Sequence, residues 1–153
     1  LKFARNSINM NKTLKKFGYP ETLLKEFDNW YLLLRPEQVT LGSLILITKN
    51  NETSLSSISD SGFNEFSKVI KIIENVLDDT FAFKKINYLM YMMVDPEVHY
   101  HIIPRYSEQK YFKDTLFEDK GWPGLPALSE PNMIDKKLQK KIITYLRDKI
   151  DSV

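Results

Sequence analysis

The 153-residue sequence contains no cysteine, which excludes disulfide bonds, thiolate catalysis and cysteine-ligated zinc sites. Its five glycines form neither a Gly-x-Gly-x-x-Gly pattern nor a Walker A loop, so a glycine-rich phosphate-binding loop is excluded. No segment reaches the roughly 18 consecutive apolar residues that a transmembrane helix needs, and no apolar run resembles a signal peptide. We therefore expect a cytoplasmic protein without a membrane partner.

A strong charge of either sign is also lacking. Lys and Arg total 22 and Asp and Glu total 20, which gives a net charge of +2. A nucleic-acid-binding domain normally has a stronger basic bias, so we expect no nucleic-acid partner. Lys136-Lys137 and Lys140-Lys141 form a modest basic cluster, for which a solvated helix face and a contact with an anionic partner both remain open.

The composition is that of an ordinary globular domain. Hydrophobic residues make up 42% and charged residues 27% of the sequence, close to the averages for soluble proteins. The length fits one domain. We predict a single domain over residues 1–153, with a core at 21–105 and a C-terminal extension at 106–153.

Short apolar runs between turn residues predict five strands. Asp28-Asn29 lies between two such runs and is favourable turn chemistry for a hairpin. Ser43 begins a run with Leu-Ile-Leu-Ile at its centre, which indicates a buried strand. The expected strands are residues 21–27, 30–34, 43–48, 86–94 and 98–103.

Two segments have helical periodicity. Apolar residues recur every three or four positions from Phe63 to Leu77, and Ser59 or Asp60 could cap this helix. A second helix is expected over residues 134–150, after an irregular segment at 106–131. The order of strands, helix, strands and helix, with hairpin connections, predicts an α+β fold with a largely antiparallel sheet.

The only two histidines lie two residues apart, at His99 and His101. Side chains alternate on a strand, so both imidazoles share one face with Glu97. Val98, Tyr100 and Ile102 face the opposite side and form a typical apolar core pattern. The polar face is therefore the candidate functional site.

Three interpretations of this face are open. The histidines could be ordinary structural residues. His99 and His101 could join Glu97 in a two-histidine, one-carboxylate metal site. Alternatively, one imidazole attacks phosphorus while its neighbour handles charge and protons, which is phosphoryl or nucleotidyl chemistry.

The segment from His99 to Arg105, His-Tyr-His-Ile-Ile-Pro-Arg, resembles the signature of the histidine triad superfamily, in which apolar residues separate three histidines. Residues 30–48 resemble the strand, bend and buried strand of that family. The resemblance covers residues 21–105 and implies an antiparallel sheet of about five strands with a long central helix, to which the periodicity adds the C-terminal helix. It also implies a homodimer.

Activities in this superfamily are hydrolysis or nucleotidyl transfer at the α-phosphorus of nucleotides, including dinucleoside polyphosphates and nucleoside phosphoramidates. The resemblance implies that His99 is the nucleophile and that His101 contacts the phosphate and assists the leaving group. We expect no bound metal and no cofactor, although Mg²⁺ can accompany substrate phosphates. The residues that the resemblance places at the substrate are Arg35, Ser43, Asn87 and Arg105.

The sequence departs from the family pattern at two positions. Glu97 occupies the first triad position, and Ser43 stands where a histidine commonly precedes the buried strand. We expect the Glu97 carboxylate to accept the Nδ1 proton of His99 and orient the ring, as a third catalytic residue. The altered triad predicts weak activity, and a non-catalytic nucleotide-binding protein is the alternative.

Overall fold

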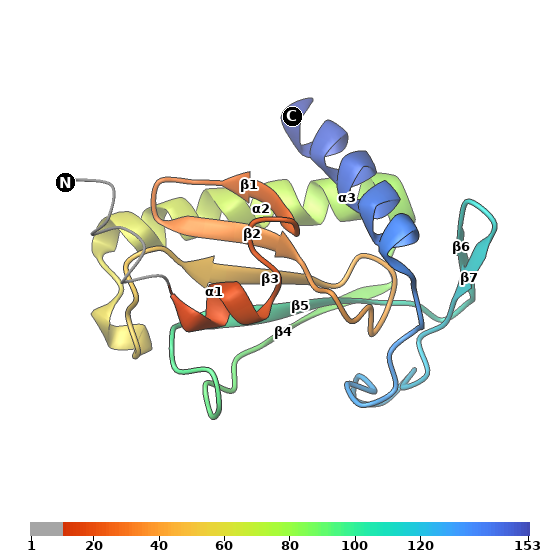
Figure 1. The fold of residues 1–153 in the computed structure, drawn as a ribbon, viewed down its shortest axis with the longest axis horizontal. Helices are drawn as coiled ribbons and strands as arrows, with labels where there is room; N and C mark the ends of the chain where they lie inside the picture. The colour runs from red at the N-terminus through yellow and green to blue at the C-terminus, as the bar shows by residue number, and fades with distance from the viewer. Residues whose placement is uncertain (1–10) are drawn as a thin grey trace.

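A computed structural model describes residues 11–153 of the chain. Its centre is a five-stranded antiparallel sheet with the order β1-β2-β3-β5-β4 (Figure 1). This arrangement confirms the predicted α+β fold with an antiparallel sheet. The strands are β1 (Leu23–Glu26), β2 (Trp30–Leu34), β3 (Leu44–Thr48), β4 (Lys85–Leu89) and β5 (His99–Arg105).

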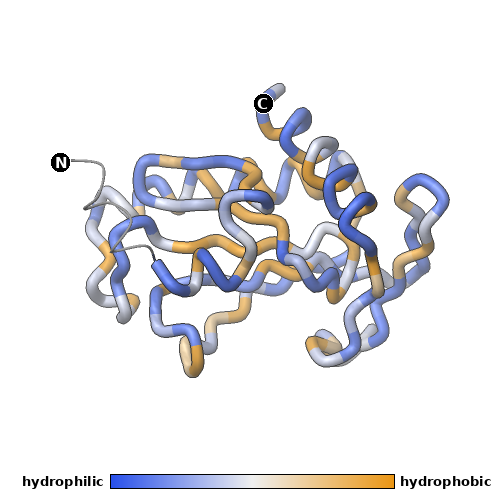
Figure 2. The backbone as a smooth tube through the Cα atoms, in the orientation of Figure 1, coloured by the Kyte–Doolittle hydropathy of each residue, from blue (hydrophilic) through white to orange (hydrophobic). Residues whose placement is uncertain are grey.

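One face of the sheet packs against two long helices, α2 (Asp60–Phe81) and α3 (Lys136–Asp151). Their apolar stripes join those of the strands in the main hydrophobic core, and Figure 2 shows the central strands as largely hydrophobic segments of the chain. The predicted cap is present, because the Ser59 hydroxyl accepts a hydrogen bond from the Gly62 amide at 3.0 Å. The Trp30 indole donates to the Gly62 carbonyl at 2.9 Å and so ties the start of α2 to the sheet.

The opposite face carries the two histidines and is partly covered by a short helix, α1 (Lys12–Lys16). Leu14 and Phe17 pack there against strand residues in a second, smaller apolar cluster. The Asn11 side chain caps α1 by accepting from the Leu14 amide at 2.9 Å. This helix was not predicted, because one turn is too short to show an apolar period.

Two other predictions need correction. The strand expected over residues 86–94 ends at Leu89, and Met92 then adopts a left-handed backbone with φ of 51°, which an extended strand does not accommodate. The segment 106–131, expected to be irregular, contains a hairpin of β6 (Lys110–Phe112) and β7 (Thr115–Phe117). A single 3₁₀ turn, Leu55–Ser57, precedes α2.

The extension after β5 is held to the sheet by a buried ion pair. Arg105 donates to both carboxylate oxygens of Asp119, at 2.6 and 3.1 Å, and the Tyr106 amide donates to the same carboxylate at 3.1 Å. Further along, Arg147 of α3 donates to the Leu23 carbonyl at 2.6 Å. Over residues 11–153, no helix combines the length and the apolar character needed to cross a membrane.

We predict that Asp119→Ala destabilises the protein by about 3 kcal/mol, because removing one partner leaves the buried Arg105 guanidinium uncompensated. The side chains of Arg105 and Asp119 are only 5% and 1% exposed. Urea unfolding measures the change, with the exposed Asp148→Ala as the matched control, for which we expect a change within about 0.5 kcal/mol. Equal effects of the two substitutions would show that the ion pair does not hold the extension.

Candidate active site

The two imidazoles lie side by side on β5, with ring centroids 5.1 Å apart and planes at 70°. They share one face of the strand, as the alternation of the sequence predicts. On the neighbouring strands, Ile47 is paired with His99, and Ile45 and Leu89 are paired with His101. These apolar neighbours keep water away from the rings, so hydrogen bonds to them are stronger than they would be in solvent.

A backbone contact determines the tautomer of His99. Its Nδ1 lies 2.7 Å from the carbonyl oxygen of Glu97. A carbonyl oxygen can only accept a hydrogen bond, so Nδ1 carries the proton and Nε2 of the neutral ring keeps its lone pair. Nε2 is thereby prepared to act as a nucleophile.

The Glu97 side chain does not make the predicted contact with His99. Its Oε2 instead accepts a hydrogen bond from the Thr13 hydroxyl at 2.5 Å. Burial opposes ionisation, but this bond and those from the backbone N–H groups of Glu97, Lys12 and Thr13 outweigh it and lower the pKa of Glu97. The carboxylate lies at the start of α1, where helix N–H groups lack partners. The prediction of a carboxylate that orients His99 is therefore wrong, because the backbone carbonyl has that role.

His101 has a different environment. Its Nδ1 accepts a hydrogen bond from Nε of Arg35 at 3.5 Å. Burial, followed by the nearby charges of Arg35 and His99, lowers the pKa of His101 from 6.5 to about 4. The neutral ring therefore carries its proton on Nε2, opposite to the assignment for His99. One ring presents a lone pair at Nε2 and the other presents a donor.

Phe17, which directly follows α1, covers both rings. Its ring centroid lies 5.9 Å from that of His99 and 5.6 Å from that of His101. His99 is consequently only 1% exposed. An ion pair of 2.7 Å between Lys16 and Asp95 joins the end of α1 to the loop before β5. Sequence reasoning missed Phe17, since nothing local connects residue 17 with β5.

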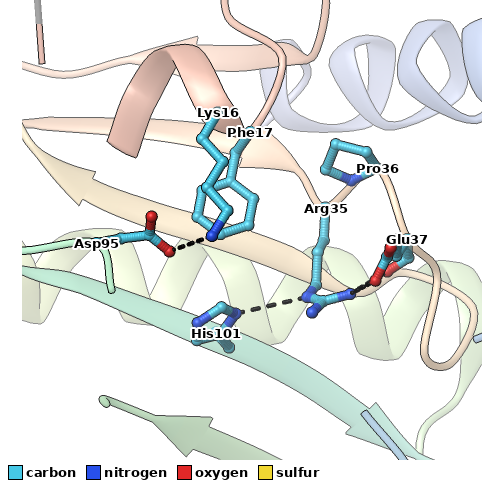
Figure 3. Close-up of a pocket in the computed structure, with 7 residues that line it drawn as sticks. All are labelled: Lys16, Phe17, Arg35, Pro36, Glu37, Asp95 and His101. Carbon is cyan, nitrogen blue, oxygen red and sulfur yellow. Dashed lines mark hydrogen bonds and ion pairs between the residues drawn. The ribbon is translucent and has the colours of Figure 1, made fainter. Parts of the chain in front are cut away.

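A cavity of about 390 Å³ opens beside His101. Figure 3 shows His101 below the side chains of Lys16 and Phe17, with the Arg35 guanidinium to its right. The volume lies within the range of small-molecule sites. Pro36, Glu37 and Asp95 complete the lining.

Of the four residues predicted to contact substrate, only Arg35 lines this cavity. Ser43 is fully buried, and its hydroxyl donates to the Thr40 carbonyl at 2.8 Å. Arg105 donates to the Asn87 side chain at 2.8 Å in addition to its pair with Asp119. Asn87 and Arg105 line a separate cavity of about 700 Å³. The side chains of Ser43 and Arg105 thus form hydrogen bonds within the fold, and Asn87 does not lie beside the histidines.

Comparisons with known proteins identify the fold. No protein-family model matches the chain, and a search of curated proteins finds no match. Among solved structures, a histidine triad protein from Marinobacter aquaeolei superposes with a TM-score of 0.72 at 16% identity, over 94% of this chain and 96% of that one. A histidine triad protein from Bradyrhizobium japonicum gives 0.70 at 17% identity, over 93% and 97%. This chain has the histidine triad fold.

A third structure with the histidine triad fold is described as a hypothetical histidine triad nucleotide-binding protein, from Sulfolobus tokodaii. It superposes with a TM-score of 0.65 at 18% identity, over 86% of this chain and 84% of that one. Across residues 11–153 of the present chain, no three His, Cys, Asp or Glu side chains converge as metal ligands. In the two-histidine, one-carboxylate interpretation, Glu97 would be the third ligand, but its carboxylate is bonded to Thr13.

We predict that His101 makes stability depend on pH between about 6.5 and 4. The unfolded chain takes up a proton near pH 6.5, whereas the folded chain does so only near pH 4. Stability present above pH 6.5 is therefore lost as the pH falls through this window. We expect the wild type to lose about 2 kcal/mol more than His101→Gln between pH 7 and 4.5 in urea unfolding. Indistinguishable losses would show that His101 is not kept neutral by the fold.

Proposed function

We propose that the chain is a nucleotide hydrolase or nucleotidyl transferase that acts at the α-phosphorus, with His99 as its nucleophile. The observation that carries this proposal is the pair of contacts at Nδ1, from His99 to the Glu97 carbonyl and from Arg35 to His101. These contacts leave a lone pair on Nε2 of His99 beside an Nε2–H donor on His101. The histidine triad fold and the description of the Sulfolobus tokodaii protein as nucleotide-binding support it.

In the proposed reaction, Nε2 of His99 attacks the α-phosphorus and forms a P–N bond as the bond to the leaving group breaks. The leaving group departs with the bonding electron pair. The positive charge that develops on His99 is stabilised through Nδ1–H by the Glu97 carbonyl, 2.7 Å away. His101 donates its Nε2 proton in a hydrogen bond to a phosphate oxygen.

Water then completes the hydrolysis. It attacks the same phosphorus, the P–N bond breaks, and a nucleoside monophosphate leaves while a proton from the water passes to solvent. In the transferase version, another nucleophile takes the place of water. Mg²⁺ can pair with substrate phosphates in either case.

The substrate must displace Phe17 to reach His99, which is 1% exposed. The Lys16–Asp95 ion pair is a weak restraint on this movement, because the lysine side chain is 51% exposed and solvent screens the attraction. The tighter Thr13–Glu97 hydrogen bond holds the other end of α1. We therefore propose that α1 stays anchored near Thr13 while Phe17 moves aside.

We also propose that two copies of the chain form a homodimer. β4 lies at the edge of the sheet and pairs only with β5 within the described residues. Its outer edge retains backbone groups that a strand of a second copy could pair with. An isologous contact of this kind follows two-fold symmetry.

A second candidate function is nucleotide binding without turnover. The burial of His99 and the replacement of the first triad histidine by Glu97 favour it. The two candidates differ in one respect, which is whether a bond forms between His99 and phosphorus.

We predict a nucleotidyl adduct on His99 when the protein is incubated with diadenosine tetraphosphate and quenched in mild alkali, which preserves the P–N bond. Intact mass spectrometry should show the adduct in the wild type and none in His99→Ala. Phe17→Ala should form it faster, because the ring no longer covers the nucleophile. Undiminished turnover by His99→Ala would sink the nucleophile assignment, and nucleotide binding with neither adduct nor turnover in the wild type would establish the second candidate.

A further inference from the structure

Arg35 is a buried cation at the wall of the cavity. It directly follows β2, is 9% exposed as a whole residue, and contacts His101 through Nε. Burying a guanidinium is costly unless an anion compensates its charge. Burial is also the main reason that the pKa of Arg35 is lowered. The positive charge of Arg35 therefore needs an anionic partner.

Within the described residues, the only carboxylate paired with Arg35 is a weak partner. Nη1 of Arg35 donates to the Glu37 carbonyl at 2.7 Å, while the Glu37 carboxylate is 3.6 Å away. That carboxylate belongs to a side chain that is 68% exposed, so solvent competes for it. Across residues 11–153, the hydrogen bonds that Arg35 donates come from Nε and Nη1, so Nη2 keeps its two donors.

Arg105 shows what a structural arginine looks like in this fold. Its guanidinium binds both oxygens of Asp119 and also the Asn87 side chain. The Asp119 side chain is 1% exposed, so solvent does not compete for its carboxylate. Arg35 lacks such a partner and faces a cavity that also contains Lys16. The difference indicates that Arg35 keeps donors free for a ligand.

We infer that Arg35 binds a second phosphate group of the substrate, in addition to the phosphorus attacked by His99. This inference rests on the proposed function and defines its substrate class as nucleotides with at least two phosphate groups. A guanidinium suits this role because its paired N–H donors match phosphate oxygens. Glu37 then turns toward solvent and leaves its position to the phosphate.

The second phosphate could belong to the phosphate chain or to the ribose, and three adenosine probes distinguish these sources. AMP has one phosphate, ADP has two in a chain, and adenosine 3′,5′-bisphosphate has the second on the ribose. Binding is measured by calorimetry in a His99→Asn background, which prevents covalent chemistry. We expect one of the two bisphosphorylated probes to bind about tenfold more tightly than AMP, the effect of one charge-assisted contact. The probe that binds more tightly than AMP shows whether the second phosphate belongs to the phosphate chain or to the ribose.

Variants of Arg35 and Glu37 should change the preference for the bisphosphorylated probe over AMP in opposite directions. Arg35→Gln should reduce it to less than about threefold, and Arg35→Lys should retain part of it because the charge remains. Glu37→Gln should increase it, because it removes the competing carboxylate. Lys71→Gln, on the exposed side of α2, removes one positive charge elsewhere and should leave the preference unchanged.

An unchanged preference in Arg35→Gln, or no preference in the His99→Asn background, would overturn the inference. An equal loss for AMP and for the bisphosphorylated probes would also overturn it, because Arg35 would then act only by positioning His101. The adduct experiment on His99 is a separate measurement. A preference that depends on Arg35 without any adduct would refute the proposed catalysis and leave the second phosphate site standing.

Discussion

The hydrogen bond from Nδ1 of His99 to the Glu97 carbonyl determines which ring nitrogen is available for chemistry. It is a contact between residues two positions apart, and it depends on how the backbone enters β5. The Glu97 side chain is bonded to Thr13, and the Asp95 side chain to Lys16. The segment from Asp95 to Glu97 thus sets both the tautomer of His99 and the position of the helix beside it.

This arrangement gives a physical account of the altered triad. A carboxylate that faced the substrate would repel its phosphates, and a buried carboxylate without partners would be costly. The N–H groups at the start of α1 and the Thr13 hydroxyl supply those partners and lower the pKa of Glu97. The negative charge is thereby directed toward a helix terminus and away from the cavity that Arg35 and Lys16 line.

The predictions that succeeded depend on local periodicity. Alternation along β5 placed His99 and His101 on one face and Tyr100 and Ile102 on the other, and the three-to-four spacing from Phe63 to Leu77 located α2. The predictions that failed concern side-chain contacts between segments far apart in the sequence, for which no periodic pattern exists. Thr13 and Glu97 are 84 residues apart, and the carboxylate that holds Arg105 lies in a segment with no recognised pattern. Such pairings are decided by packing, so the sequence alone assigned the Glu97 carboxylate to His99 and Arg105 to the substrate.

The fold holds the two imidazoles in opposite tautomers. With only two histidines in the chain, long-range proton–nitrogen NMR correlations on ¹⁵N-labelled protein at neutral pH report both rings without ambiguity. We predict a protonated Nδ1 and an unprotonated Nε2 for His99, and the reverse for His101. A proton on Nε2 of neutral His99 would rule this out, because the nitrogen that we propose attacks phosphorus would then have no lone pair to use.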